Sequence, residues 1–267
     1  MWPRIGQLPT YGVCYIIGFF FYFIIGWRLA KRLGLRRRIW IITGLCYVFG
    51  MTIGAKILFN IQKSMFDFSA LFTMKHYTQG GLWGGLLAYF CLSVPIVLLL
   101  SKRKQAALDL VAMSVPVPWI FAKLGCLFNG CCYGKPCTLP WAITFPEGAR
   151  SNVPAGVPLH PTQIYEIFLM IIIIVVFIIL RSQKWRGTKL FLFLAIYGIG
   201  RAFIEFFRGD FEQHRYIGSL TLSQLLCIIA AGISIIILIA SFGVILCWYG
   251  NLHYRNMLTS TLRISSP

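Results

Sequence analysis

The residues with the clearest chemistry lie within one apolar segment. Residues 189–208 read KLFLFLAIYGIGRAFIEFFR, in which Tyr197, Arg201, Glu205 and Arg208 are spaced four, four and three residues apart. On a helix this spacing places all four in one polar stripe. A charged side chain at the centre of a bilayer costs about 2.5–3.5 kcal/mol on insertion scales, so such groups normally face the protein interior. The stripe is either an internal ion pair between Arg201 and Glu205 or an anion site for a lipid head group, because guanidinium groups bind phosphate through paired hydrogen bonds.

A second polar motif opens another apolar segment. Residues 159–166 read LHPTQIYE. Pro161 suits the first turn of a helix, and Gln163 and Glu166 are three residues apart and share a helical face. His160 lies just before this helix, where its ring can point at a substrate. The alternative is a histidine at the membrane interface followed by a helix cap.

Two further apolar segments begin with a glycine motif and a tyrosine. Residues 79–85 read QGGLWGG. Gly80 and Gly81 permit irregular backbone, which is tolerated at membrane depth where it lines a cavity, or they allow close helix packing. Tyr11 lies at the start of the first apolar segment, in the sequence TYG, where on its own it indicates an aromatic anchor at the membrane interface.

Four cysteines gather in the stretch 122–137, which reads AKLGCLFNGCCYGKPC. Their spacing, C-x4-C-C-x4-C, contains no C-x2-C pair and is not a standard zinc spacing. On an outer membrane face, oxidising conditions favour disulfides. We therefore expect one or two disulfides among these residues, with free buried thiols or a metal site as the alternatives. The four are Cys126, Cys131, Cys132 and Cys137.

The composition of the whole chain is that of a polytopic membrane protein. Of 267 residues, 58% are apolar and only 12% are charged, against about half and a quarter in soluble domains. This excludes a soluble globular enzyme, a disordered chain and a fibrous one. The formal net charge of +18 is explained by the positive-inside rule and by contact with anionic membrane lipids. No nucleic-acid partner is expected.

Seven segments are long and apolar enough to span a bilayer as helices. Pro116 and Pro118 interrupt the short fourth segment, which is either a kinked span or a re-entrant piece, so six spans is the alternative. The first segment is expected to remain as a span, without a cleavable signal peptide. The segments are 9–27, 39–59, 80–100, 107–122, 163–180, 189–207 and 221–247.

The distribution of charge predicts the orientation. Fifteen of the 25 basic residues follow the first, third and fifth segments or lie in the C-terminal tail, which places the N-terminus outside and the C-terminus in the cytoplasm. The outer side then holds most of the acidic residues and the longest loop, 123–162. The fold class is therefore an all-α membrane protein, with residues 1–267 forming a single polytopic membrane domain and the loop 123–162 inserted between spans four and five.

Taken in order, these motifs resemble those of the prolipoprotein diacylglyceryl transferases of bacterial inner membranes. The resemblance runs from Tyr11 to about Gln224. It includes TYG, QGGL, a loop of the form G-x-x-x-N-G followed by YG, and PW at Pro140-Trp141. It continues through HPTQIYE, YGIGRAFIEFFRGD and LTLSQLL. The HPTQIYE and YG-x-x-R-x-x-x-E-F-F-R motifs are the most specific of these.

The resemblance implies a multi-pass enzyme of the bacterial inner membrane with seven spans. It implies transfer of the diacylglyceryl group from phosphatidylglycerol to the lipobox cysteine of a prolipoprotein signal peptide, with glycerol phosphate leaving and a thioether forming. The partners would be phosphatidylglycerol, that signal peptide and membrane lipids. No cofactor and no metal are implied.

The resemblance also suggests roles for individual residues. Arg201 would bind the phosphate, Glu205 would orient it, and Arg208 would serve the phosphate or a second opening. The expected catalytic residues are Arg201, His160, Glu205, Tyr11 and Tyr197. The expected substrate-binding residues are Lys123, Asn129, Gly125, Gly134, Gln163, Glu166, Arg208, Gly80 and Gly81.

The chain departs from the family pattern at several of these positions. The loop signature normally begins Gly-Arg and then Gly-Asn and later carries a glutamate, whereas this chain has Ala122-Lys123, Gly125-Cys126 and Cys131. Lys123 keeps the charge but loses the guanidinium fork. The glycine motif, which often carries a histidine proposed as base, here has Trp83.

These departures leave the catalytic base and the function open. The candidates for the base are His160, His76, Glu205 and a tyrosine. Two functional alternatives to the transferase remain. One is a paralogue that acts on another lipid or acceptor. The other is a non-catalytic lipid-binding or transport protein, although the chain has no internal repeat of the kind found in many transporters.

Overall fold

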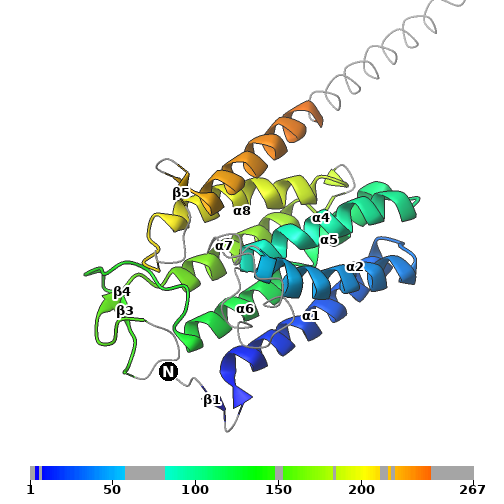
Figure 1. Cartoon of the computed structure of the whole chain (residues 1–267). Coiled ribbons are helices and arrows are strands. Elements are labelled where there is room, and N and C mark those ends of the chain that lie inside the picture. The colour runs from blue at the N-terminus through cyan, green and yellow to red at the C-terminus, as the bar shows by residue number, and fades with distance from the viewer. Residues whose placement is uncertain are drawn as a thin grey trace, which may run out of the picture.

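The protein is a bundle of long apolar helices in a computed structural model (Figure 1). The structure describes residues 4–5, 8–57, 82–147, 153–182, 185–210, 216–217 and 220–241. The helices are α1 (Thr10–Arg32), α2 (Arg37–Phe49), the π-helix η1 (Gly50–Gly54), α4 (Leu82–Leu100), α5 (Lys104–Met113), α6 (Pro116–Asn129), α7 (Thr162–Ile179), α8 (Lys189–Glu205) and a last helix, Leu222–Ser241.

Five helical stretches of the described chain are long and apolar enough to cross a membrane. They are Thr10–Arg32, Arg37–Ile57, Lys104–Asn129, Thr162–Ile179 and Leu222–Ser241. α4 and α8 lie at the third and sixth predicted segments and are not among these five; the apolar part of α4 is the shorter stretch Gly84–Leu100, and α8 has 17 residues. The prediction of a mostly helical membrane protein is therefore confirmed. The ends of predicted segments at 58–59, 80–81 and 242–247 lie outside the described residues.

The fourth apolar segment is a helix broken in the middle. α5 ends at Met113 and α6 begins at Pro116, because proline has no N–H to continue the hydrogen-bond ladder but fits the first turn of a helix. α6 ends at Asn129 and is capped by Gly130, whose left-handed φ of 75° suits glycine. Residues 123–129 of the predicted loop 123–162 therefore belong to this helix.

The strands of the described chain are short and form three antiparallel pairs. β1 (Arg4–Ile5) pairs with β2 (Leu8–Pro9), β3 (Ile143–Thr144) with β4 (Pro158–Leu159), and β5 (Tyr216–Ile217) with β6 (Leu220–Thr221). β1, β3 and β4 lie at one end of the bundle (Figure 1). Isolated bridges join Gly134 to Arg208 and Pro136 to Leu159, so the segment after α6 is bound to the residues after α8 and before α7.

The helices pack around a core that contains buried tyrosines. α6 packs against α1 and α7, α7 against α8, and α4 against α2 and η1. The Tyr22 hydroxyl donates to the Thr43 carbonyl and lies 3.0 Å from the Tyr89 hydroxyl, which donates to the Val111 carbonyl. These bonds join α1, α2, α4 and α5. Large apolar side chains cover the outside of the bundle, such as Leu99 (84% exposed) and Ile179 (70% exposed), as expected of helices that face lipid.

Candidate active site

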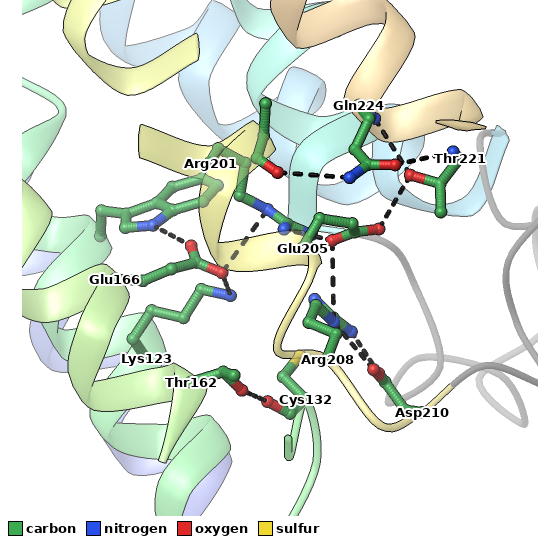
Figure 2. Close-up of polar contacts among 12 residues, drawn as sticks. Lys123, Cys132, Thr162, Glu166, Arg201, Glu205, Arg208, Asp210, Thr221 and Gln224 are labelled. Carbon is green, nitrogen blue, oxygen red and sulfur yellow. Dashed lines mark hydrogen bonds and ion pairs between the residues drawn. The ribbon is translucent and has the colours of Figure 1, made fainter. Parts of the chain in front are cut away.

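A chain of buried charged side chains runs across α6, α7 and α8. It begins at Lys123 on α6, passes Glu166 on α7 and continues through Arg201 and Glu205 on α8 to Arg208 (Figure 2). Each of these five residues is less than 9% exposed. The helical spacing that predicted a polar stripe is confirmed for Arg201, Glu205 and Arg208, and the stripe faces the interior of the bundle.

Glu166 is the junction between the three helices. Its Oε1 lies 2.7 Å from Lys123 Nζ and 3.6 Å from Arg201 Nε, and its Oε2 accepts a hydrogen bond of 3.1 Å from the Trp119 indole. One carboxylate on α7 thus holds a lysine from α6 and an arginine from α8. Because all three are buried, this junction fixes the relative positions of the helices as well as the direction of the Arg201 side chain.

Glu205 continues the chain on α8. It pairs with Arg201 one turn earlier, its Oε2 lies 4.0 Å from Arg208 Nε, and its Oε1 accepts a hydrogen bond of 3.1 Å from Thr221 Oγ1. Arg208 Nε in turn donates to Asp210 Oδ1 over 2.8 Å. Three basic and three acidic side chains therefore alternate, which keeps the buried charges balanced and both guanidinium groups held in place.

Two buried polar atoms beside this chain lack a hydrogen-bond partner in the described part of the structure. They are the Tyr197 hydroxyl and Gln163 Oε1. Tyr197 lies one turn before Arg201, with its ring edge-on to Trp119 at 5.6 Å. Buried polar groups are nearly always paired, so an unpaired one calls for an explanation. A polar ligand at this site would accept a hydrogen bond from the Tyr197 hydroxyl and donate one to Gln163 Oε1.

Sequence reasoning assigned no role to four residues of the network. These are Trp119, Asp210, Thr221 and Gln224. A local signal was present for two of them, because T-x-x-Q before an apolar run predicts a capping box. Thr221 N donates to Gln224 Oε1 over 2.9 Å, and Gln224 N donates to Thr221 Oγ1 over 3.1 Å. This cap presents the Thr221 hydroxyl to Glu205.

His160 belongs to a second cluster, apart from the ion pairs. Its Nδ1 lies 3.1 Å from the Tyr165 hydroxyl, which also accepts a hydrogen bond from the Trp141 indole, and its ring lies 5.0 Å from that of Phe207. No hydrogen bond joins the His160 side chain to the charged network within the described ranges. Burial, followed by the positive charge of Lys135, lowers the pKa of His160 below its usual value, so the ring is neutral at pH 7.

The two signature glycines lie where chain segments come into close contact. A Cβ on Gly134 would lie 2.4 Å from His160 Cβ and 2.5 Å from the His160 carbonyl oxygen. A Cβ on Gly125 would lie 3.1 Å from Cys14 Cβ and 3.3 Å from the Tyr11 ring. Gly134 therefore fixes the segment that carries His160, and Gly125 brings Tyr11 on α1 close to α6. Buried Asn129 ends α6.

Three of the four loop cysteines converge beside α7. The Sγ atoms of Cys126, Cys131 and Cys132 all lie within 4.8 Å of one another. The described cysteines, Cys137 included, are free thiols in this structure, so the expected disulfides are not formed here. The predicted Gly80 and Gly81 and the base candidate His76 lie outside the described residues.

Comparisons with known proteins give a consistent family relationship. The family model described as prolipoprotein diacylglyceryl transferase matches residues 3–240. A phosphatidylglycerol–prolipoprotein diacylglyceryl transferase of Nitratidesulfovibrio vulgaris (strain DSM 19637 / Miyazaki F) is 29% identical over 89% of this chain and 91% of its own length. One of Clostridium tetani (strain Massachusetts / E88) is 34% identical over 61% of this chain and 66% of its own length. Phosphatidylglycerol–prolipoprotein diacylglyceryl transferase 2 of Clostridium perfringens (strain 13 / Type A) is 35% identical over 66% of this chain and 68% of its own length.

Proposed function

Because the chain belongs to the prolipoprotein diacylglyceryl transferase family, we propose that it transfers a diacylglyceryl group from phosphatidylglycerol to a prolipoprotein. The relatives named for this reaction match most of the chain. The acceptor is the thiol of the lipobox cysteine in the signal peptide. The products are a thioether and glycerol phosphate.

The observation that carries this proposal is the buried chain of ion pairs with an unpaired hydroxyl beside it. Arg201 and Arg208 bind the donor phosphate, and the Tyr197 hydroxyl donates to one of its oxygens. Glu166 and Glu205 hold the guanidinium groups in position before the donor arrives. Such prearranged donors stabilise the charge that develops on the departing phosphate, and they need no reorganisation during the reaction.

The remaining predicted residues shape the surroundings of this phosphate. Lys123 forms an ion pair with Glu166 and so adds a positive charge to the network. Gln163 accepts a hydrogen bond from a hydroxyl of the glycerol head group. Tyr11 and Asn129 line the head-group side, where Gly125 and Gly134 keep the segments close. Gly80 and Gly81, outside the described ranges, remain substrate-binding residues of this proposal. His160 lies at the peptide entrance.

The protein acts in the bacterial inner membrane as a single seven-span domain. The five long apolar helices, together with α4 and α8, make up the seven spans. The positive-inside rule places the N-terminus outside and the C-terminus in the cytoplasm. The loop that follows α6 then lies on the outer face, where the signal peptide is presented.

The test is an assay with purified protein in phosphatidylglycerol vesicles and a lipobox peptide. Mass spectrometry should detect the diacylglyceryl mass on the peptide cysteine, and a peptide with serine at that position should gain nothing. Arg201→Ala should abolish the product. Arg28→Ala, which changes an exposed arginine of α1, should not.

Two results would redirect the proposal. Transfer from phosphatidylethanolamine vesicles but not from phosphatidylglycerol would identify a paralogue with another donor, which the altered residues Lys123, Cys126 and Cys131 make a specific alternative. A folded protein that binds phosphatidylglycerol and modifies no peptide would contradict transfer altogether.

A further inference from the structure

The cysteine cluster has the geometry of a three-thiolate metal site. With Sγ atoms no more than 4.8 Å apart, the centre of the triangle lies within about 2.8 Å of each sulfur, and zinc–sulfur bonds are about 2.3 Å. In a tetrahedral zinc site the sulfurs lie about 3.8 Å apart, so each would move inward by at most about 0.6 Å. The chain achieves this convergence by a tight turn after α6, in which Gly130 and Cys132 have left-handed φ angles of 75° and 59°.

The number and type of ligands favour zinc with an open position. Thiolates select zinc or copper(I) over hard cations. Within the described ranges, the group holds three cysteines and no fourth histidine, cysteine, aspartate or glutamate. Structural zinc sites are closed by four protein ligands, whereas catalytic ones keep three and leave the fourth for water or substrate.

The cluster is attached to the elements that carry the charged network. Gln163 Nε2 donates to the Cys131 carbonyl over 2.7 Å, and the Thr162 hydroxyl donates to the Cys132 carbonyl. Gln163 lies one turn before Glu166 on α7. On the other side, Gly134 is bridged to Arg208. Figure 2 shows Cys132 between Thr162 and Arg208, next to the ion pairs.

The proposed reaction needs a group that produces the acceptor thiolate. The thiolate, not the thiol, is the nucleophile. Glu166, Glu205 and Asp210 are each already engaged in ion pairs with one or two basic side chains. A thiol that coordinates a metal ion is deprotonated outright.

We propose that Cys126, Cys131 and Cys132 bind a zinc ion whose fourth position takes the lipobox cysteine of the acceptor peptide as a thiolate. This inference rests on the proposed transferase function. It differs from the sequence-based expectation of disulfides and of no metal. The cluster would place the nucleophilic sulfur next to the arginines that hold the donor phosphate.

The step is balanced without any oxidant. On coordination the peptide thiol releases its proton to solvent. An electron pair of the sulfur then forms a bond to the carbon of the diacylated glycerol that carries the phosphate, and the bond between that carbon and the phosphate oxygen breaks with its electrons remaining on the oxygen. Glycerol phosphate leaves from the arginines, and the neutral thioether, a weaker zinc ligand than the thiolate, is released.

The first experiment measures coordination. Protein loaded with Zn²⁺ and desalted should hold one zinc per chain, and X-ray absorption should show three sulfurs at about 2.3 Å. Adding the lipobox peptide in phosphatidylcholine vesicles, which contain no donor, should raise the sulfur count to four. Cys131→Ser and Cys132→Ser should lose the zinc. Cys137→Ser, in the same loop but outside the cluster, should retain it.

The second experiment measures transfer by wild-type protein with and without its metal. Chelation should lower the rate in phosphatidylglycerol vesicles about 30-fold at pH 7, since a free thiol of pKa about 8.5 is only a few per cent ionised there, and Zn²⁺ should restore it. Undiminished transfer by metal-free protein would overturn the zinc site and leave the transferase function intact. The zinc site would also be overturned by a disulfide within the cluster, or by a bound zinc ion whose sulfur count stays at three when the peptide is added. Failure of zinc-loaded protein to transfer would refute the function and, with it, this role of the metal.

Discussion

Replacing Glu166 by glutamine should be among the most destabilising single changes in the charged network. Glu166 is 1% exposed and pairs with Lys123, which is 2% exposed, at 2.7 Å, and with Arg201 at 3.6 Å. Glu166→Gln keeps the shape and an acceptor for the Trp119 indole but leaves the Lys123 charge without a counterion. Removing one partner of a buried pair costs about 3–5 kcal/mol. We expect a loss of that size in the free energy of unfolding.

The assay is reversible unfolding in mixed micelles of a mild detergent and dodecyl sulfate, followed by tryptophan fluorescence. Adding Lys123→Met to Glu166→Gln removes the unpaired charge and should recover about 1–3 kcal/mol, because coupled sites are not additive. Glu147→Gln changes an exposed carboxylate and should stay within about 0.5 kcal/mol of the wild type. Wild-type stability of Glu166→Gln, or additive losses in the double variant, would refute the reasoning.

Three further predictions concern the residues around the network. Tyr197→Phe should leave the unfolding free energy within about 0.5 kcal/mol, since the hydroxyl has no partner among the described residues, yet lower the transfer rate about tenfold; equal rates would show that the hydroxyl does not touch the donor. Gly134→Ala should lower the unfolding midpoint because its Cβ would lie 2.4 Å from His160 Cβ. At Gly156 an added Cβ would meet nothing within 4 Å, so Gly156→Ser should lose only the stability that its left-handed φ costs a side chain; a smaller loss at Gly134 than at Gly156 would contradict the close contact. Because the folded-state pKa of His160 is lowered, its neutral ring contributes full stability above the unfolded value of about 6.5. That stability is lost as the pH falls from there through the folded value, so the difference in unfolding free energy between pH 7.5 and pH 5 should shrink in His160→Gln; an unchanged difference would contradict the assignment.

The polar stripe could be predicted from sequence because its information is local. Three charged residues spaced at helical intervals share a face wherever the helix packs, and the cost of charge in a membrane directs that face inward. Their partners from other helices could not be predicted in the same way. Glu166 was expected at the site, but its contacts with Trp119 and Lys123 span 47 and 43 residues and depend on how α6 packs against α7.

Other expectations depended on three-dimensional placement that spacing does not determine. His160 lies three residues before Gln163, yet its ring contacts Tyr165 and Phe207 and not the ion pairs. The cysteine spacing did not distinguish a disulfide from a cluster, since that depends on the turn at Gly130 and Cys132. Gly125 and Gly134 were expected to contact substrate. In the structure Gly125 packs against Tyr11 and Gly134 packs against His160.

The most direct test of the central claim is the transfer rate of Arg201→Lys. Lysine keeps the positive charge but has no guanidinium to bridge Glu166, Glu205 and a phosphate. In phosphatidylglycerol vesicles with the lipobox peptide, release of glycerol phosphate and formation of the lipidated peptide should both fall about 100-fold, or about 2.7 kcal/mol, while the protein stays folded. A folded Arg201→Lys that transfers at the wild-type rate would contradict the claim that this buried arginine binds the departing phosphate.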